Sequence, residues 1–257
     1  MKIDEYIVGA VVIATVTFCA LLGLFVVRRA FHFDRLRRCH EVAGYLLSVV
    51  GTMYAVLLGL IVVDAMGRFE SARTAVEKEA NSLADIYLLA ERLGSERGGE
   101  VRRLCVDYVT AVIDDEWPAM ARGEVSLKAR AVSLALIRRI SEFEPVSENH
   151  KAVYPLVLEE AFELWDNRRA RTNLAIYGVP PIEWLVLVLG GVVTITFTYF
   201  FSVESIRAQT VMTTFVSLLI ALNVYLVVLF AAPFSGDLRV QPDAMELDRA
   251  IFRGHYG

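Results

Sequence analysis

Hydrophobic residues in this 257-residue chain gather in four long runs that are separated by charged segments. The runs are Tyr6–Val27, Val42–Val63, Trp184–Val203 and Val211–Ala232. Each is close to the roughly 20 residues that an α-helix needs to cross a hydrocarbon core about 30 Å thick. The pattern therefore predicts four transmembrane helices. The first run is too long for the apolar part of a signal peptide, so we expect it to be retained.

The region between the second and third runs has a different pattern. Residues 64–181 hold sixteen Lys or Arg residues and twenty Asp or Glu residues, and their apolar positions recur at helical spacing. The helices predicted there are Asp64–Leu93, Glu100–Arg122, Ser126–Phe143 and Lys151–Tyr177. We expect the helices to be separated by the GSERGG sequence, by Gly123 and by the segment Pro145–Asn149.

The predicted fold class is an all-α membrane protein, with four transmembrane helices and an all-helical extramembrane module inserted between spans two and three. Its parts are transmembrane helices 1 and 2 in residues 1–63, with a basic loop at 28–41, the module in 64–181, transmembrane helices 3 and 4 in 182–232, and a C-terminal tail in 233–257. The tail begins with PFSGDLRV, which predicts a helix stop and a turn at the membrane surface. A second interpretation folds this segment back against the module near Asp64 and Arg68.

The second hydrophobic run continues into the module without a proline or a turn signal. One apolar face, with Tyr54, Leu58 and Ile61, leads on to Ala65 and Phe69 at the same helical spacing. This predicts a single helix that is unbroken at Asp64. From residue 42 to residue 93 such a helix would measure roughly 78 Å at about 1.5 Å per residue.

A neighbouring face of the same helix carries only small or hydroxyl residues. They are Gly44, Ser48, Gly51, Thr52, Ala55 and Gly59. Small residues permit close helix packing in a bilayer, which is one interpretation. The other is that several copies of the helix surround an axis and that this face lines a permeation path. Beyond the membrane the face leads to charged candidates for a vestibule, Glu70, Arg73 and Glu77.

Few polar groups lie within the other runs, and none of the four runs contains Asp, Glu, Lys or Arg away from its edges. Threonines such as Thr194 and Thr198 are expected to bond to their own helix backbone. Asn223 is different, because an amide near mid-membrane is costly unless it has a partner. We expect Asn223 to bond to a neighbouring helix or to water.

The sequence contains no pattern typical of a catalytic, cofactor or metal site. Cys19, Cys39 and Cys105 are isolated from one another, and the four histidines are scattered. The acidic triplet Asp114, Asp115 and Glu116 is expected to be a solvated helix end. We predict no catalytic, cofactor-binding or metal-binding residues, no cofactor and no enzymatic activity, and we expect no nucleic-acid partner.

Charge favours one orientation in a bacterial cytoplasmic membrane. The loop at 28–41 carries Arg28, Arg29, Arg35, Arg37 and Arg38, whereas the other end of the first span offers only Lys2. By the positive-inside rule this loop is cytoplasmic, which places the module on the extracytoplasmic side. Basic residues that flank the module side of spans two and three weaken the asymmetry.

Several blocks together resemble the bacterial bestrophin-like family: HEVAGYLLSVVGTMYAVLLGLIVV, RFESARTAVEKEANSLADIYLLA, DDEWPAMARG, TFTYFFSVESIRAQ and PFSGDLRVQP. The resemblance covers the chain from Val42 to Pro242. It implies a homo-oligomeric ion channel, because the distantly similar bestrophins are pentameric anion channels whose second helix lines the pore. It also implies a cytoplasmic module, opposite to the charge rule. The proline- and phenylalanine-containing neck motif of bestrophins is absent from the second span.

These observations predict a homo-oligomeric ion channel in which span two lines the path and the module forms a vestibule or gate. Its partners would be further copies of the chain, with a pentamer implied by the resemblance alone, membrane lipids and inorganic ions. The alternative is a membrane-anchored helical scaffold or sensor through which no ion passes.

Overall fold

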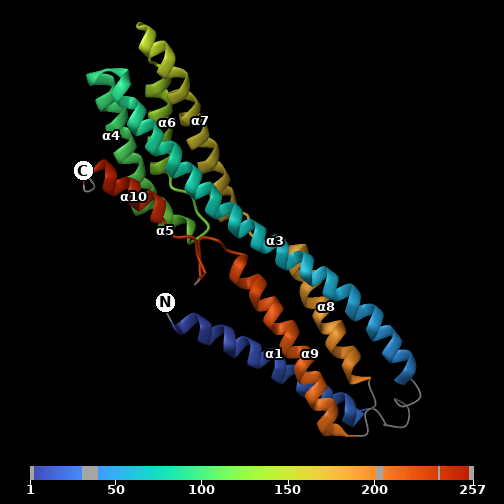
Figure 1. The fold of residues 1–257 in the computed structure, drawn as a ribbon. Coiled ribbons are helices and arrows are strands. Elements are labelled where there is room, and N and C mark those ends of the chain that lie inside the picture. The colour runs from blue at the N-terminus through green and yellow to red at the C-terminus, as the bar shows by residue number, and fades with distance from the viewer. Residues whose placement is uncertain (1–2, 31–39, 201–204, 237, 255–257) are drawn as a thin grey trace. The chain divides into compact units, whose positions relative to one another are not determined.

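The computed structural model describes residues 3–30, 40–200, 205–236 and 238–254, and all of its regular elements there are helices (Figure 1). The chain divides into two compact units. The first, the membrane unit, comprises residues 1–67 and 179–231, and the second, the module unit, comprises residues 68–178 and 232–257. The predicted basic loop, including Arg35, Arg37 and Arg38, lies largely outside the described residues.

The membrane unit contains four helices that are long and apolar enough to span a bilayer, as predicted. They are α1 (Ile3–Ala30), the first part of α3 (His40–Leu89), α8 (Pro181–Tyr199) and α9 (Ile206–Phe230). Helix α8 begins with a proline, and the Ser205 hydroxyl caps α9 by accepting a hydrogen bond from the Ala208 backbone NH. Helix α1 packs against α9 and α8, and α8 packs against α9.

Tyrosine rings fill glycine notches at several contacts in this unit. A Cβ atom added to Gly23 would lie 2.7 Å from the hydroxyl oxygen of Tyr199. The same hydroxyl donates a hydrogen bond of 2.7 Å to the carbonyl oxygen of Ala20. Tyr225 occupies a similar notch at Gly9, where the added Cβ would lie 2.3 Å from the ring. The absence of a side chain at these glycines is what allows the rings to insert between the helices.

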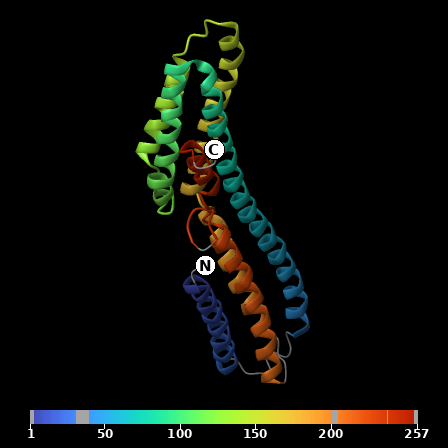
Figure 2. The same ribbon diagram turned by 60° about the vertical axis from the view of Figure 1, so that its left-hand side comes forward.

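The module unit is a helical bundle around a core of its own (Figure 2). It is formed by the remainder of α3, a 3₁₀ turn η1 (Ala90–Leu93), α4 (Ser95–Ala111), a π-helix η2 (Val112–Glu116), α5 (Trp117–Met120), α6 (Leu127–Ser141), α7 (Glu148–Ile176) and α10 (Asp243–Phe252). Ser126 and Ser147 cap α6 and α7 through their hydroxyl oxygens. Helix α4 packs against α6, and α6 packs against α7.

One of the predicted breaks in the module has a different form in the structure. The GSERGG sequence does not separate helices as a loop, because α4 already begins at Ser95 and only Gly94, with φ of 94°, makes the turn. Gly98 lies inside α4, where an added Cβ would come within 2.2 Å of the Ala90 carbonyl oxygen. This glycine therefore permits a close approach of two backbones. Gly123 does end its helix, with φ of 73°.

The C-terminal segment is more ordered than a tail. It contains α10, which the hydrophobic pattern did not predict, and α10 packs against α4. Preceding it, Phe234 is buried with its ring at 87° to that of Trp117 and 5.7 Å from it between centroids. The PFSGDLRV segment thus folds onto Trp117, a residue that the sequence did not single out as its partner.

Helix α3 continues from His40 to Leu89 with no interruption at Asp64, as the sequence pattern predicted. Its 50 residues correspond to about 75 Å of helix at about 1.5 Å per residue. The helix therefore contributes both to the membrane unit and to the core of the module unit.

Candidate functional site

Among the described residues, no other helix of the subunit covers the small-residue face of α3. Ser48, Thr52, Ala55 and Gly59 are exposed, and Gly44 and Gly51 are partly exposed. A Cβ atom added to Gly51 or Gly59 would meet no other atom within 4 Å. The Thr52 hydroxyl donates to the Ser48 carbonyl oxygen of the same helix at 2.7 Å. The face therefore consists of small side chains, with the hydroxyl oxygens of Ser48 and Thr52 as its polar side-chain atoms.

The adjacent face of α3 is held against the rest of the membrane unit. Tyr54, Leu58 and Ile61 are buried in the unit's core. The Tyr54 hydroxyl donates to the carbonyl oxygen of Leu187 on α8 at 3.0 Å, and its ring fills a notch at Gly190. These contacts determine which side of α3 faces its own subunit and which side is left open.

The vestibule candidates belong to the module unit and are all exposed. Arg73 and Glu77 form an ion pair of 3.0 Å along the helix surface, with side chains that are 61% and 54% exposed. Glu70 lies on the same side of α3, at helical spacing from both. Such solvated pairs add little stability, so these charges are free to serve a surface role.

Asn223 bonds to its own helix among the described residues, and its expected bond to a neighbouring helix or to water stays a prediction. Its amide nitrogen donates to the Leu219 carbonyl oxygen of its own helix at 2.9 Å, and the side chain is only partly buried. Thr194 and Thr196 bond back to their own helix, as expected, to Gly190 and Val192. The hydroxyls of Thr198 and Thr213 also lie 3.3 Å apart, across α8 and α9. A one-turn bond to the preceding carbonyl satisfies an amide hydrogen without help from another helix.

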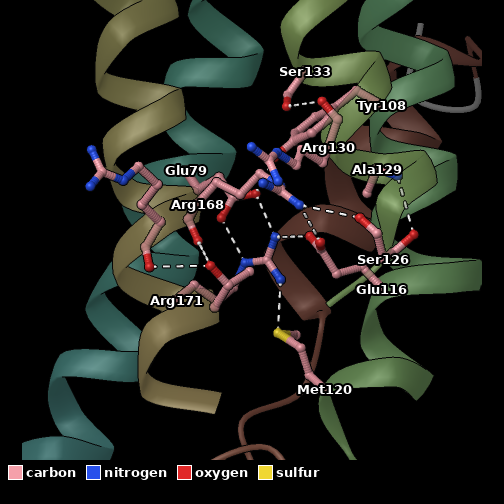
Figure 3. A network of polar contacts seen from close by, with 12 residues as sticks. Glu79, Tyr108, Glu116, Met120, Ser126, Ala129, Arg130, Ser133, Arg168 and Arg171 are labelled. Carbon is pink, nitrogen blue, oxygen red and sulfur yellow. Dashed lines mark hydrogen bonds and ion pairs between the residues drawn. The ribbon is translucent and has the colours of Figure 1, made fainter. Parts of the chain in front are cut away.

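The most elaborate polar arrangement lies in the core of the module and was not predicted (Figure 3). Arg171 on α7 makes two bonds to Glu79 on α3, with distances of 2.6 and 2.8 Å. Its Nη2 atom also lies 2.8 Å from the carboxylate of Glu116. Arg168, one turn earlier on α7, reaches the other oxygen of Glu116 at 2.5 Å. Two carboxylates and two guanidinium groups therefore balance each other inside the bundle.

Further contacts complete this buried network. Tyr108 donates its hydroxyl hydrogen to Glu79 at 2.6 Å, and the Sδ atom of Met120 lies 3.1 Å from Nη1 of Arg171. The Arg171 guanidinium also lies 5.3 Å from the ring of Trp117, a cation–π contact. Glu79, Tyr108, Glu116 and Arg171 have no exposed surface.

The π-helix η2 places Glu116 in the network. The predicted solvated triplet is wrong for this residue, because Asp114 and Asp115 bond at the surface to Arg249 and Lys128 whereas Glu116 is buried. A π-turn inserts one extra residue into the helix, so the residues after it are rotated relative to an α-helix. Successive residues of a helix also point in different directions, so one of the three acids faces inward while the other two lie at the surface.

Burial and charge shift the pKa values in this network in understandable directions. Burial raises the pKa of Tyr108 well above its ordinary value, and the neighbouring Glu79 carboxylate raises it further. For Arg171, burial by itself would lower the pKa, but the charges and hydrogen bonds of Glu79 and Glu116 outweigh burial and raise it. Both shifts favour a charged guanidinium and a neutral phenol.

Sequence reasoning had no direct signal for the network, since charged residues on helices of a polar segment are usually solvated. The usable signal is periodicity. Glu79 lies in register with the buried positions Ala72, Val76 and Leu83 of α3. Arg171 similarly follows Leu164 by seven residues on α7. A charge on an apolar stripe is a candidate for a buried ion pair.

A profile of the bestrophin-like domain matches residues 14–245 of the chain. The chain belongs to the bestrophin-like family. Comparison with curated proteins finds no significant match.

The bestrophin-like chain also shares its fold with solved structures. A crystal structure of a bacterial bestrophin homologue from Klebsiella pneumoniae, phased with zinc, matches with a TM-score of 0.72 at 16% identity, over 94% of this chain and 98% of the other. A point-mutant crystal structure of a Klebsiella pneumoniae bestrophin homologue matches with a TM-score of 0.72 at 14% identity, over 94% and 99% of the two chains. The all-α membrane fold predicted from the sequence is confirmed by these likenesses.

Proposed function

We propose that this bestrophin-like protein is a homo-oligomeric ion channel in which α3 lines the permeation path. The observation that carries the proposal is the open small-residue face of α3, Gly44 to Gly59, next to a face that is buried in its own subunit. Membership of the bestrophin-like family supports it. The pentamer remains an inference from the resemblance to bestrophins.

A face made of glycine, alanine and hydroxyl residues is poorly suited to lipid contact. Exposed positions elsewhere on α3 carry large apolar side chains, such as Val49, Met53 and Val56, which suit contact with lipid. Small residues instead allow helices to approach one another closely. Around a symmetry axis, the same residues leave room for ions and supply Ser48 and Thr52 as oxygen ligands.

The α3 segment constrains the kind of selectivity. From Gly44 to Val63 it contains no Asp, Glu, Lys or Arg, so a ring of charged side chains at mid-membrane is not available. Hydroxyl and carbonyl oxygens and a dewetting hydrophobic constriction are the remaining devices. We place charge selection in the module, where Glu70, Arg73 and Glu77 would form a vestibule or gate.

The membrane is taken to be the bacterial cytoplasmic membrane, with the module on its extracytoplasmic side as the positive-inside rule favours. The resemblance to bestrophins favours the opposite side. The exposed Asn81 of α3 offers a test. An Asn81→Cys variant with the native cysteines changed to Ser should react in intact cells with a membrane-impermeant thiol reagent. Labelling only after permeabilisation would place the module in the cytoplasm.

Reconstitution in liposomes tests the channel directly. The purified oligomer should pass inorganic ions, and Ala55→Trp should reduce the flux by at least tenfold because the indole would fill the open face. The matched control is Met53→Trp, since Met53 is 65% exposed and lies about 160° around the helix from Ala55. Its flux should stay close to that of the unmodified protein.

The same measurement separates the channel from the alternative, a membrane-anchored scaffold or sensor. If the intact oligomer passes none of the common anions and cations, the channel proposal is wrong. If both tryptophan variants reduce the flux equally, ions pass but the small-residue face is not their path.

A further inference from the structure

Helix α10 carries a carboxylate in the centre of the face with which it docks onto the module. Met245, Asp248 and Phe252 are its buried residues, and their spacing places them on one side of the helix. Met245 is fully buried, and the Phe252 ring stacks on Tyr87 of α3 at 4.1 Å between centroids. Asp248 lies between these two apolar anchors and is only 6% exposed.

One oxygen of the Asp248 carboxylate lacks the hydrogen bond that a buried carboxylate requires. Its Oδ2 atom is inaccessible to solvent and has no hydrogen-bond partner among the described residues. An ionised carboxylate in such a place is costly unless it is paired. This contrasts with Glu79 and Glu116 in the same unit, each of which is matched by arginine.

The groups around Asp248 come from each element that α10 packs against. On α3, Asp85 interacts electrostatically with Asp248 and has the same sign of charge. On α4 the fully buried Cys105 interacts electrostatically with Asp248. Arg102, also on α4, interacts electrostatically with Cys105. The Arg102 guanidinium, however, is bonded to the Tyr87 carbonyl oxygen and to Glu91. From η2, Asp114 is paired with Arg249 of α10.

We propose that Asp248 is a proton-binding site and that its occupancy controls the docking of α10 on the module. With a proton, the side chain is a neutral group that the apolar interface tolerates. Without it, an unpaired charge is buried beside Asp85, and the docked position of α10 is weakened. The proposal concerns the module alone and does not depend on ion conduction.

The direction of the effect follows from the two states. Burial, and secondly Asp85, raise the pKa of Asp248 in the docked state to about 7. In an undocked helix the carboxyl would have the ordinary value of about 3.9. Docking is therefore strongest below about pH 4, weakens by about tenfold per pH unit as pH rises, and reaches its weakest level above about pH 7.

Cys105 provides a reporter for this equilibrium. Its thiol has no exposed surface on the helix against which α10 packs, so it should react only when α10 has moved away. In a Cys19→Ser, Cys39→Ser background, the labelling rate of Cys105 would be measured from pH 5 to pH 8. Dividing by the rate in the denatured chain at the same pH removes the chemistry of the thiol itself.

The normalised rate should rise by roughly a hundredfold from pH 5 to pH 8, with most of the rise below pH 7. Asp248→Asn keeps the size of the side chain and removes the titration, so its normalised rate should be flat. The control is Glu246→Gln, an exposed acid of the same helix, which should keep the full rise. A flat profile in the unmodified protein, or an unchanged rise in Asp248→Asn, would overturn the proposal.

Discussion

The membrane unit and the module unit solve the problem of buried polarity in opposite ways. In the membrane unit, the buried Thr194 and Thr198 bond to carbonyl oxygens of their own helix, and tyrosine hydroxyls reach backbone carbonyls across glycine notches. In the module unit, full charges are buried and matched, as in the pair Arg171 and Glu79. One helix, α3, takes part in both arrangements.

The contrast shows how the surrounding solvent limits the choice. A membrane helix is inserted one segment at a time, and ionised side chains in lipid are expensive. Bonds to the local backbone and close packing at glycine carry no such cost. A bundle that folds in water already buries an apolar core, and a matched set of charges inside it demands one relative placement of α3, α7 and η2. We expect the module to be sensitive to charge and the membrane unit to be sensitive to shape.

The largest effect should come from breaking the buried network. Arg171→Ala leaves Glu79 without its main partner, and removing one member of a buried ion pair typically costs about 3–5 kcal/mol. Thermal unfolding in detergent should show the corresponding loss of module stability. Arg171→Met should be less harmful when combined with Glu79→Gln, because no unpaired charge then remains. If Arg171→Ala lowers the stability of the module only slightly, the module is not more sensitive to charge than the membrane unit.

A matched pair of tyrosine substitutions sharpens the comparison. Tyr108→Phe removes a bond to a charged acceptor and should cost about 1.5–3 kcal/mol of unfolding free energy. Tyr54→Phe removes a bond to a neutral carbonyl and should cost only about 0.5–1.5 kcal/mol. Both changes delete one oxygen atom from a buried ring. Equal costs, measured by denaturant unfolding of both variants, would mean that charge adds nothing in the module.

Shape sensitivity in the membrane unit is tested at Gly190. A methyl group there would lie 2.3 Å from the ring of Tyr54, and such overpacking should cost about 1–3 kcal/mol. Gly59→Ala is the control, because its methyl group would have no described neighbour within 4 Å. The melting temperature of the detergent-solubilised oligomer should fall for Gly190→Ala and stay near that of the unmodified protein for Gly59→Ala. The reverse order would show that the open face is the more tightly packed one.

The smallest effect is expected for the exposed ion pair. Arg73→Ala should change the stability of the module by no more than about 0.5 kcal/mol, since Arg73 and Glu77 are largely solvated. If unfolding shows a cost similar to that of Arg171→Ala, this pair is buried in the assembled protein, and its proposed place in an open vestibule is wrong.

The sequence predicted the parts of the fold that depend on periodicity. Long apolar runs identified the membrane helices, and the unbroken apolar face from Tyr54 to Phe69 predicted the continuity of α3. The open face of α3 was also visible as a row of small residues, although its role stays a prediction. These features are local, since each can be recognised within one helix.

What the sequence did not reveal depends on partners from distant segments. Helix α10 has two fully apolar anchors, Met245 and Phe252, with a carboxylate between them, and Leu247 and Ile251 lie on its exposed side. Its apolar pattern is therefore ambiguous. Glu79 and Arg171 are 92 positions apart, and neither charge by itself distinguishes a solvated face from a buried pair. Such information exists only once the helices have been brought together.

The π-helix Val112–Glu116 contains one residue more than an α-helical turn would, and this limits where the chain can accept a deletion. Removing one of the residues that precede Glu116 in this turn would restore regular α-helical phase and rotate the Glu116 carboxylate by about 100° away from Arg168 and Arg171. A one-residue deletion should therefore be rejected here, while most substitutions at the solvent-facing Asp114 are accepted.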